Sequence, residues 1–252
     1  MSRLKNKVAV ITGGNSGIGF GIAEAFNNEG AVGGIVGRNQ ETLNSAAARL
    51  GGNFIAINAD VTNLADLERV FAVTAEKFGK IDIIVANAGG GAVGTVATTG
   101  EADFDQAIDL NLKSVYFTVQ KALPYMNDGG SIILIGSNAA HRAYANFTLY
   151  GAAKAAVIYL AKAFSSDLLD RNIRANVITP GTTDTPAFEK FVPAEQIEAV
   201  KKHFASVMPT GRIGQPADIG KTAVFLASDD SSFMLGAELL VDGGMTLFIK
   251  II

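Results

Sequence analysis

The stretch KVAVITGGNSGIG, from Lys7 to Gly19, carries the strongest structural signal in the chain. Its first half, Lys7–Thr12, is a short apolar run rich in β-branched residues, which is typical of a buried parallel strand. Gly13, Gly17 and Gly19 follow, and helical periodicity begins with them. A strand, a glycine-rich turn and a helix can bind a pyrophosphate, because glycines let the backbone approach it and the helix N-terminus supplies free N–H groups. The spacing Gly-x3-Gly-x-Gly differs from the usual dinucleotide fingerprint, so an ordinary tight connection is the alternative.

The alternation of strand and helix continues along the chain. Further strands are predicted at Val32–Val36, Asn53–Asn58, Ile81–Val85, Ser131–Ile135, Arg174–Ile178 and Glu238–Val241. The helices predicted between them are Gln40–Leu50, Leu64–Phe78, Glu101–Tyr125, Tyr150–Asp170 and Pro216–Ala227. We therefore expect one α/β domain over residues 1–252, a Rossmann-type, doubly wound parallel sheet of seven strands flanked by helices. The alternation of strands and helices is interrupted at Thr182–Met208, a segment that we expect to form a substrate-binding lid.

The composition restricts the class of protein. The 252 residues are 48% hydrophobic and 18% charged, which is typical of a globular domain, and both signs of charge are spread along the chain with a net of −3. This pattern indicates neither a nucleic-acid partner nor a membrane-spanning segment. The chain has no Cys, so the cytoplasm is the simplest setting, and His141 and His203 lie far apart, which argues against a metal site.

Tyr150 and Lys154 carry the first chemical signal. They lie four residues apart in an Ala-rich predicted helix, so both side chains point to the same face. A free phenol titrates near ~10, and a neighbouring ammonium group favours its ionised form. The pair can therefore serve as an acid/base, although a surface Tyr beside a solvated Lys has the same spacing.

Several polar residues follow directly after the predicted strands. Ligands of parallel sheets bind beyond the carboxyl ends of the strands, so these side chains are expected to gather at one edge. Some have an ordinary structural use as well, because Ser137 and Asp60 can cap a turn or helix. The residues of this group are Asn15, Ser16, Arg38, Asp60, Asn87, Ser137 and Thr182.

Seven motifs occur one after another between Val8 and Gly244. They are Thr12-Gly13-x3-Gly17-x-Gly19, Asp60, Asn87-Ala88-Gly89, Asn111, Ser137, Tyr150-x3-Lys154 and Pro180-Gly181. Their order and spacing resemble those of the short-chain dehydrogenase/reductase family. The resemblance implies reversible hydride transfer between a nicotinamide cofactor and a carbonyl/alcohol pair.

The resemblance also implies roles for single residues. Tyr150 would be the acid/base, Ser137 would polarise the substrate oxygen, and Lys154 would also bind the nicotinamide ribose. Asn111 would steady a water that links Lys154 to solvent, although an Asn within a helix can also bond to its own backbone. The cofactor residues implied are Gly13, Asn15, Ser16, Gly17, Ile18, Gly19, Arg38, Asp60, Val61, Asn87, Ala88, Gly89, Tyr150, Lys154, Pro180, Gly181 and Thr183. The substrate residues expected are Ser137, Ala139, Tyr144, Tyr150 and Phe188.

The end of the second predicted strand indicates which cofactor is used. An NAD site places a carboxylate there, where it bonds the adenosine ribose and repels a 2′-phosphate. This chain has Gly37 at that position and Arg38 directly after it, and a guanidinium group can meet a phosphate with two charge-assisted hydrogen bonds. We therefore predict a preference for NADP(H), with NAD(H) as the second cofactor. A solvated Arg at a helix entrance is the alternative for Arg38.

The substrate and the assembly are less closely defined by the sequence. Phe188, Phe191 and Phe204 in the lid segment favour an apolar or weakly polar ketone or secondary alcohol over a phosphorylated or carrier-bound one. A catalytically silent nucleotide-binding sensor or scaffold is the alternative function, and a sugar-nucleotide epimerase or dehydratase fits less well. The apolar tail Leu247–Ile252, together with the resemblance, predicts a homotetramer.

Overall fold

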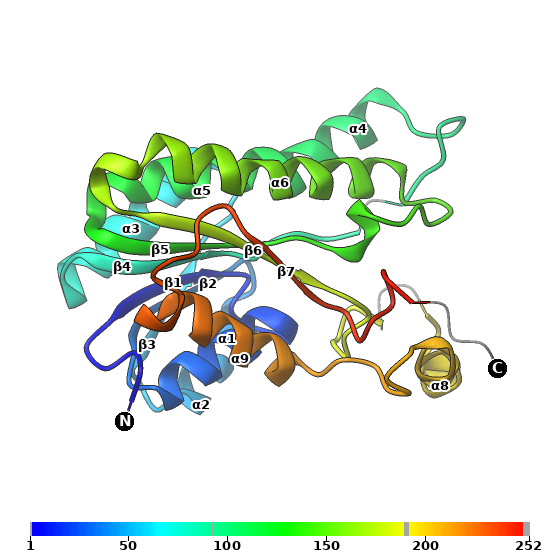
Figure 1. The fold of residues 1–252 in the computed structure, drawn as a ribbon, viewed down its shortest axis with the longest axis horizontal. Helices are drawn as coiled ribbons and strands as arrows, with labels where there is room; N and C mark the ends of the chain where they lie inside the picture. The colour runs from blue at the N-terminus through cyan, green and yellow to red at the C-terminus, as the bar shows by residue number, and fades with distance from the viewer. Residues whose placement is uncertain (1, 92, 189–191, 249–252) are drawn as a thin grey trace.

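A computed structural model describes residues 2–91, 93–188 and 192–248 of the chain. Within them, strands form a single sheet in the order β3-β2-β1-β4-β5-β6-β7, and every neighbouring pair is parallel (Figure 1). This confirms the predicted seven-stranded Rossmann-type fold. The strands are β1 (Val8–Thr12), β2 (Val32–Gly37), β3 (Phe54–Asn58), β4 (Ile81–Ala86), β5 (Met126–Ile135), β6 (Arg174–Pro180) and β7 (Glu238–Val241).

Helices cover both faces of the sheet, one layer on each side (Figure 1). Successive side chains of a strand point to opposite faces, so Val8 and Val10 of β1 join one core while Ala9 and Ile11 join the other. The first core lies under α3 (Leu64–Phe78), α5 (Ser114–Ala122) and α6 (Thr148–Asp167). The second lies under α1 (Gly17–Asn28), α2 (Gln40–Arg49) and α9 (Pro216–Ala227).

Helices α1 and α9 approach each other very closely. A Cβ atom added at Gly21 would lie 2.5 Å from the Pro216 side chain, and one added at Gly220 would lie 2.5 Å from the Gly21 carbonyl oxygen. Larger residues would force the helices apart at both positions. The first turns of α1, which follow the glycine-rich turn, are therefore packed tightly against α9.

The structure departs from the sequence prediction in three places. The helix expected at Glu101–Tyr125 consists of α4 (Glu101–Ile108), a π-helical turn (Asp109–Lys113), α5 and a short 3₁₀ turn. Strand β5 begins at Met126, five residues before the predicted start at Ser131, because polar residues and glycines conceal its first half. The segment 182–208 contains a regular helix, α8 (Ile197–Val207), instead of being irregular throughout.

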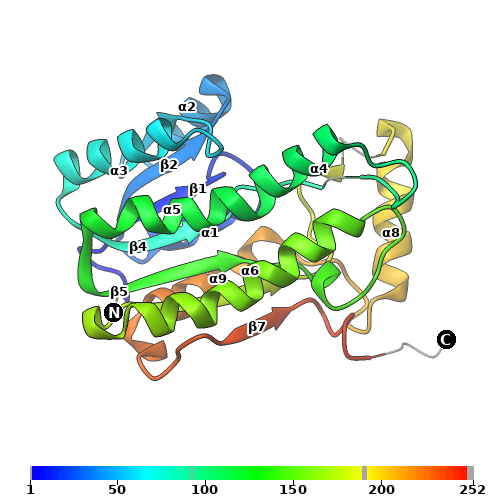
Figure 2. The same cartoon turned by 90° about the horizontal axis from the view of Figure 1, so that it is seen from above.

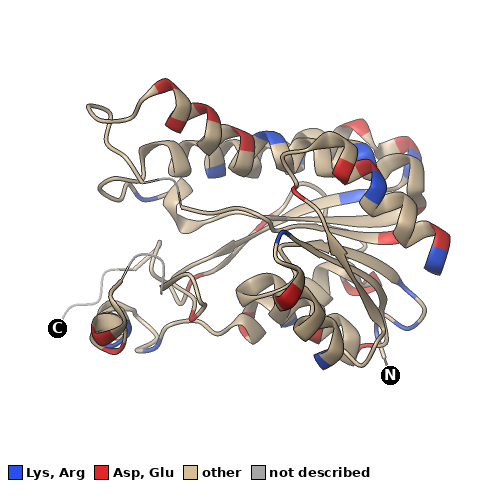
Figure 3. Cartoon of the chain, turned by 180° about the vertical axis from the view of Figure 1, so that it is seen from behind, with Lys and Arg blue, Asp and Glu red and all other residues tan. Residues whose placement is uncertain are grey.

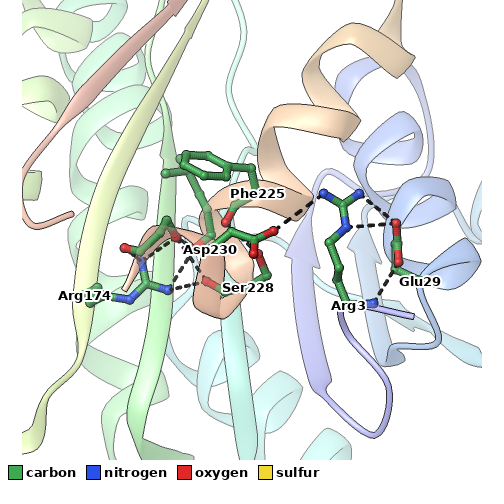
Figure 4. Close-up of polar contacts among 8 residues, drawn as sticks. Arg3, Glu29, Arg174, Phe225, Ser228 and Asp230 are labelled. Atoms are coloured by element: carbon green, nitrogen blue, oxygen red, sulfur yellow. Dashed lines mark hydrogen bonds and ion pairs between the residues drawn. The ribbon is translucent and has the colours of Figure 1, made fainter. Parts of the chain in front are cut away.

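The N-terminal end of β6 is closed by a buried cation. The Arg174 guanidinium group donates to the carbonyl oxygens of Leu226, Ser228 and Ser231, near the C-terminus of α9, and so satisfies carbonyls that the helix leaves free (Figure 4). Beside it, Arg3 pairs with Glu29 and also approaches Asp230. This edge of the sheet is thus occupied by structural contacts.

The opposite edge carries the long loops. Figure 2 shows α4 and α8 extending past the carboxyl ends of the strands, with the last described residues of the chain at the same end. Figure 3 shows Lys and Arg interspersed with Asp and Glu over the helices. None of the helices in the described ranges combines the length and the apolar character that a bilayer crossing needs.

Candidate active site

The glycine-rich turn joins β1 to α1. Gly13 and Gly17 have φ angles of +65° and +53°, a backbone conformation that side chains disfavour. A Cβ atom at Gly19 would lie 2.1 Å from the Gly13 carbonyl oxygen, so only glycine fits there. Ser16 precedes α1 without a side-chain hydrogen bond to it, which leaves the first N–H groups of the helix available to an anion.

Asn87 fixes this turn to the end of β4. Its Nδ2 donates to the carbonyl oxygens of Thr12 at 2.8 Å and Gly13 at 3.2 Å. The Thr12 hydroxyl in turn accepts from the backbone N–H groups of Asn87 and Ala88, both at 3.0 Å. Asn87 therefore shapes the cofactor cradle through the backbone. Thr12, which in the sequence is only the first residue of the glycine motif, is its partner.

A cleft of about 600 Å³ runs along the carboxyl ends of the strands. It brings together most of the residues expected at the cofactor site, from Arg38 at one end to Lys154 at the other. The expected residues that line it are Gly13, Asn15, Ser16, Gly17, Ile18, Gly19, Arg38, Asp60, Val61, Asn87, Ala88, Gly89, Ser137, Tyr150, Lys154, Pro180 and Gly181.

Ser137 and Tyr150 face the cleft from neighbouring elements. Ser137 follows β5, and its Oγ accepts from the Ala139 N–H at 3.2 Å, so it caps a 3₁₀ turn while also lining the cleft. Tyr150 lies in the first turn of α6, and the Phe147 ring meets its ring edge-on with centroids 5.9 Å apart. Phe147 also lines the cleft.

Lys154 lies deeper than Tyr150 on the same helix. Its side chain is buried, its Nζ donates to the Ile135 carbonyl oxygen at 2.8 Å, and the ammonium group lies 5.8 Å from the Tyr150 ring centroid. Burial lowers the pKa of Lys154 from 10.5 to about 8, because the charged form loses its water. At neutral pH the group is still mostly protonated.

Burial also raises the pKa of Tyr150 above its usual value of 10.0, and a hydrogen bond with the Ser137 side chain opposes this only in part. The direction is opposite to the one expected from the Tyr150–Lys154 spacing. The reason is that the loss of water around the phenol outweighs the Ser137 hydrogen bond, which favours the ionised form. The Tyr150 hydroxyl is therefore protonated at neutral pH.

Asn111 lies in the π-helical turn, behind the loop that follows β4. Its Oδ1 accepts from the Gly90 N–H and its Nδ2 donates to the Ala107 carbonyl oxygen, both at 3.0 Å. A Cβ atom at Gly89 would lie 3.1 Å from Asn111 Oδ1 and 3.5 Å from Lys154 Nζ. Asn111 and Lys154 thus flank the same glycine, although Asn111 is not among the residues that line the cleft.

Arg38 and Asp60 form the other end of the cleft. Arg38 follows β2, and its NH1 lies 4.0 Å from Asp60 Oδ2, with side-chain exposures of 73% and 40%. A Cβ atom at Gly37 would lie 2.7 Å from Asn15 Oδ1, and Asn15 is itself held by a hydrogen bond from its Nδ2 to Thr42 Oγ1. An acidic side chain at position 37 would therefore displace Asn15.

Besides Asn111, the structure places four residues expected to contact the cofactor or the substrate away from the lining of the cleft. Thr183 is buried and donates to the Gly181 carbonyl oxygen; the nearby residues that line the cleft are Thr185, Pro186 and Ala187. The sequence signal that could have identified these three residues is their position a few residues beyond the end of β6. Ala139, Tyr144 and Phe188 also lie outside the lining, so their substrate contacts stay predictions.

Two aromatic residues of the segment 182–208 contact each other. Phe188 packs against Phe204 with ring centroids 6.3 Å apart, whereas Phe191 lies outside the described residues. Phe147, which packs against Tyr150, and Leu110 are apolar residues of the cleft lining. No cluster of three His, Cys, Asp or Glu residues suited to a metal ion occurs in the ranges that the structure describes.

The donor set of the cleft fits a nicotinamide dinucleotide. The glycine-rich turn and the N-terminus of α1 suit its pyrophosphate, because backbone N–H groups can approach where a side chain could not fit. Tyr150, Lys154, Arg38 and Asp60 line the same cleft as this turn. Arg38 and Asp60 follow β2 and β3 on one side of β1, whereas Tyr150 and Lys154 belong to α6, which follows β5 on the other side.

Comparisons with known proteins agree with this geometry. Residues 13–246 match the family model described as Enoyl-(Acyl carrier protein) reductase. The chain is similar to Oxidoreductase asL5 of Sarocladium schorii, with 42% identity over 97% of this chain and 98% of that protein. It is also similar to the NADP-dependent (R)-specific alcohol dehydrogenase of Lentilactobacillus kefiri, with 35% identity over 97% of this chain and 98% of that one.

Among solved structures, a short-chain dehydrogenase/reductase SDR:Glucose/ribitol dehydrogenase from Brucella melitensis superposes with a TM-score of 0.90. The two share 31% sequence identity over 98% of this chain and 99% of that one. The chain thus belongs to the short-chain dehydrogenase/reductase family of NAD(P)-dependent oxidoreductases, which interconvert CH–OH and C=O groups.

Proposed function

We propose that the protein is an NADP(H)-preferring ketone reductase or secondary-alcohol dehydrogenase with Tyr150 as its acid/base. One observation carries the proposal: Ser137, Tyr150 and Lys154 line the same cleft as the glycine-rich turn. A substrate oxygen near Tyr150 would therefore lie close to a cofactor held by that turn.

The bound nicotinamide supplies or accepts the hydride. In the reduction direction the Tyr150 hydroxyl, which is protonated at neutral pH, donates its proton to the substrate oxygen. The Ser137 hydroxyl donates a hydrogen bond to that oxygen, where negative charge develops. The buried ammonium group of Lys154 then stabilises the phenolate that remains on Tyr150.

The preference for NADP(H) is supported by the residues after β2. Arg38 lines the cleft with an exposed guanidinium group that can bind a 2′-phosphate. Gly37 stands at the position where an NAD site would carry an acidic residue. The side chain of Asn15 occupies the space that such an acid would need. A relative named as an NADP-dependent alcohol dehydrogenase is consistent with this preference. NAD(H) is the second cofactor.

We propose a free, apolar or weakly polar ketone or secondary alcohol as the substrate. Phe147, whose ring packs against that of Tyr150, lines the cleft together with Leu110, Pro186 and Ala187, and all four lack charge. Such a lining stabilises apolar substituents by removing them from water. The protein is proposed to act on them in the cytoplasm.

The segment 182–208 is proposed to act as the substrate lid. Its base is fixed, because the Gly214 N–H donates to the Thr182 carbonyl oxygen at 2.9 Å and the Asp184 N–H donates to Gly214 at 2.8 Å. Beyond this base the segment reaches across the cleft, where a Cβ atom at Gly17 would lie 3.2 Å from Thr185. A fixed base suits a segment that opens and closes over a bound ligand.

The test is the variant Tyr150→Phe, which removes only the oxygen that carries the proton. We expect cofactor binding close to that of the wild type and loss of almost all ketone reduction, measured with NADPH and with NADH. Tyr159→Phe is the matched control, because Tyr159 lies on the same helix but is exposed. If Tyr150→Phe kept more than about a tenth of the wild-type kcat/KM, a loss of less than about 1.4 kcal/mol, Tyr150 would not be the acid/base.

A further inference from the structure

From the charges of the cleft we infer that Asp60 limits the selectivity of the enzyme for a 2′-phosphate by partly neutralising Arg38. This inference rests on the proposed preference for NADP(H). It assigns to Asp60 a discriminating role, in addition to the place among the cofactor residues that the family resemblance implies.

Few charged groups line the cleft. Within the part of the chain that the structure describes, they are Arg38, Asp60 and Lys154. Lys154 is buried beside Tyr150, so of these three charges the first two lie nearest to a 2′-phosphate bound at Arg38. Asp66, which accepts from the Asp60 N–H, is itself paired with Arg69 at 2.9 Å. Their charges are equal and opposite, and Arg38 NH1 lies 4.0 Å from Asp60 Oδ2.

The sheet brings these two residues together. Gly37, the last residue of β2, is paired with Asn58, the last residue of β3, so the residues that follow each strand emerge side by side. Asn58 Nδ2 also donates to the Arg38 carbonyl oxygen at 2.8 Å, which holds the backbone of Arg38 at this position. The acid that is missing at the end of β2 is thus present just beyond the end of the neighbouring strand.

Local hydrogen bonds orient the Asp60 carboxylate. Its Oδ1 accepts from the Thr62 N–H at 2.9 Å and from the Thr62 hydroxyl at 2.8 Å. The Asp60 N–H donates to Asp66 Oδ2 at 2.9 Å, which fixes the backbone as well. With Oδ1 engaged, Oδ2 is the oxygen that faces Arg38.

This arrangement has a definite electrostatic consequence. A carboxylate near the phosphate site repels the phosphate and attracts the guanidinium group that should bind it. It has no comparable effect on a cofactor with a free 2′-hydroxyl group. Asp60 should therefore lower the affinity for NADP(H) relative to NAD(H), which makes the second cofactor more competitive.

The test compares adenosine 2′,5′-bisphosphate with adenosine 5′-monophosphate, whose ratio of dissociation constants measures recognition of the 2′-phosphate. Asp60→Asn keeps the shape of the side chain and an acceptor for Thr62 but removes the charge. We expect it to raise the selectivity for the bisphosphate about threefold or more at low salt, as for a partly exposed charge pair. Glu76→Gln is the control, because it removes one negative charge from an exposed site on α3 outside the cleft.

A salt titration of the wild type provides a second readout that needs no variant. With Arg38 and Asp60 offsetting each other, its selectivity should change little between about 0.02 and 0.5 M salt, whereas that of Asp60→Asn should fall steeply. Selectivity unchanged by Asp60→Asn, or an equally steep fall in the wild type, would overturn the inference. A wild type that binds the bisphosphate no more tightly than the monophosphate would instead contradict the NADP(H) preference, and the effect of Asp60→Asn would still decide the role of Asp60.

Discussion

Replacing Lys154 by Met should stabilise the protein while it destroys activity. Lys154 is buried, and its pKa falls from 10.5 to about 8, so folding must bury an ammonium group that water would otherwise solvate. At about 1.36 kcal/mol per pKa unit, this burial costs roughly 3 kcal/mol at neutral pH. Met has a similar length and no charge to desolvate.

One loss offsets part of this gain. Lys154 Nζ donates a hydrogen bond to the Ile135 carbonyl oxygen at 2.8 Å, which Met cannot replace. A buried acceptor left without its donor costs about 1 kcal/mol. The net stabilisation expected for Lys154→Met is therefore about 2 kcal/mol at neutral pH, which corresponds to an increase in Tm of about 4–8 °C for a domain of this size.

The gain should depend on pH in a defined direction. Because the folded-state pKa of Lys154 is depressed, the unfolded chain binds more protons between about pH 8 and 10.5, and wild-type stability rises with pH in that window. The burial cost is complete below about pH 8 and falls below about 1 kcal/mol near pH 10. The advantage of Lys154→Met should therefore disappear by about pH 10.

Unfolding by urea or heat at about pH 7 and pH 10 measures this difference. Lys162→Met is the matched control, because Lys162 lies on the same helix but is exposed, and it should change stability little at either pH. An unfolding midpoint of Lys154→Met at or below that of the wild type at pH 7 would refute the reasoning. So would an advantage that persists unchanged at pH 10.

Three further predictions concern cofactor choice, lid movement and assembly. Arg38→Asp should raise KM for NADPH and favour NADH relative to the wild type; a wild type with the higher kcat/KM for NADH would contradict the role of Arg38. Hydrogen exchange in 182–208 should slow when cofactor and substrate bind, and equal protection in the free and bound enzyme would count against a lid. The exposed side chains of Leu247 and Phe248, at 68% and 63%, should be covered in a homotetramer, and a monomer mass by light scattering would exclude it.

The sequence alone predicted the order and type of nearly all elements. Helices α3 and α9 and strand β7 occur at the predicted residues, because hydrophobic periodicity of 3.6 or 2 residues is a local property that a single sequence displays. Strand β5 was predicted too short, since Asn127, Asp128 and Gly129 interrupt the apolar run although the backbone stays extended. The π-helical turn around Asn111 left no signal, because it differs from an α-helix in its hydrogen bonds and not in its composition.

Spacing in the sequence also predicted that most of the expected residues would gather in one cleft. The glycine-rich turn, Asn87 and the Tyr150–Lys154 pair line it because each follows a strand or begins a helix at the same edge of the sheet. The sequence prediction named Thr183, whereas the residue that lines the cleft is Thr185. Both follow β6 within a few residues, and the choice depends on where the backbone turns after the contact with Gly214.

Charge interactions were decided by the tertiary structure alone. Only strand pairing brings Arg38 and Asp60, 22 positions apart in the sequence, within 4.0 Å of each other. Only packing buries Lys154 and Tyr150 deeply enough to move their pKa values, and it raises that of Tyr150 although the helix places a cation nearby. A sequence records which groups can ionise, but their ionisation depends on how much water and which charges the fold leaves around them.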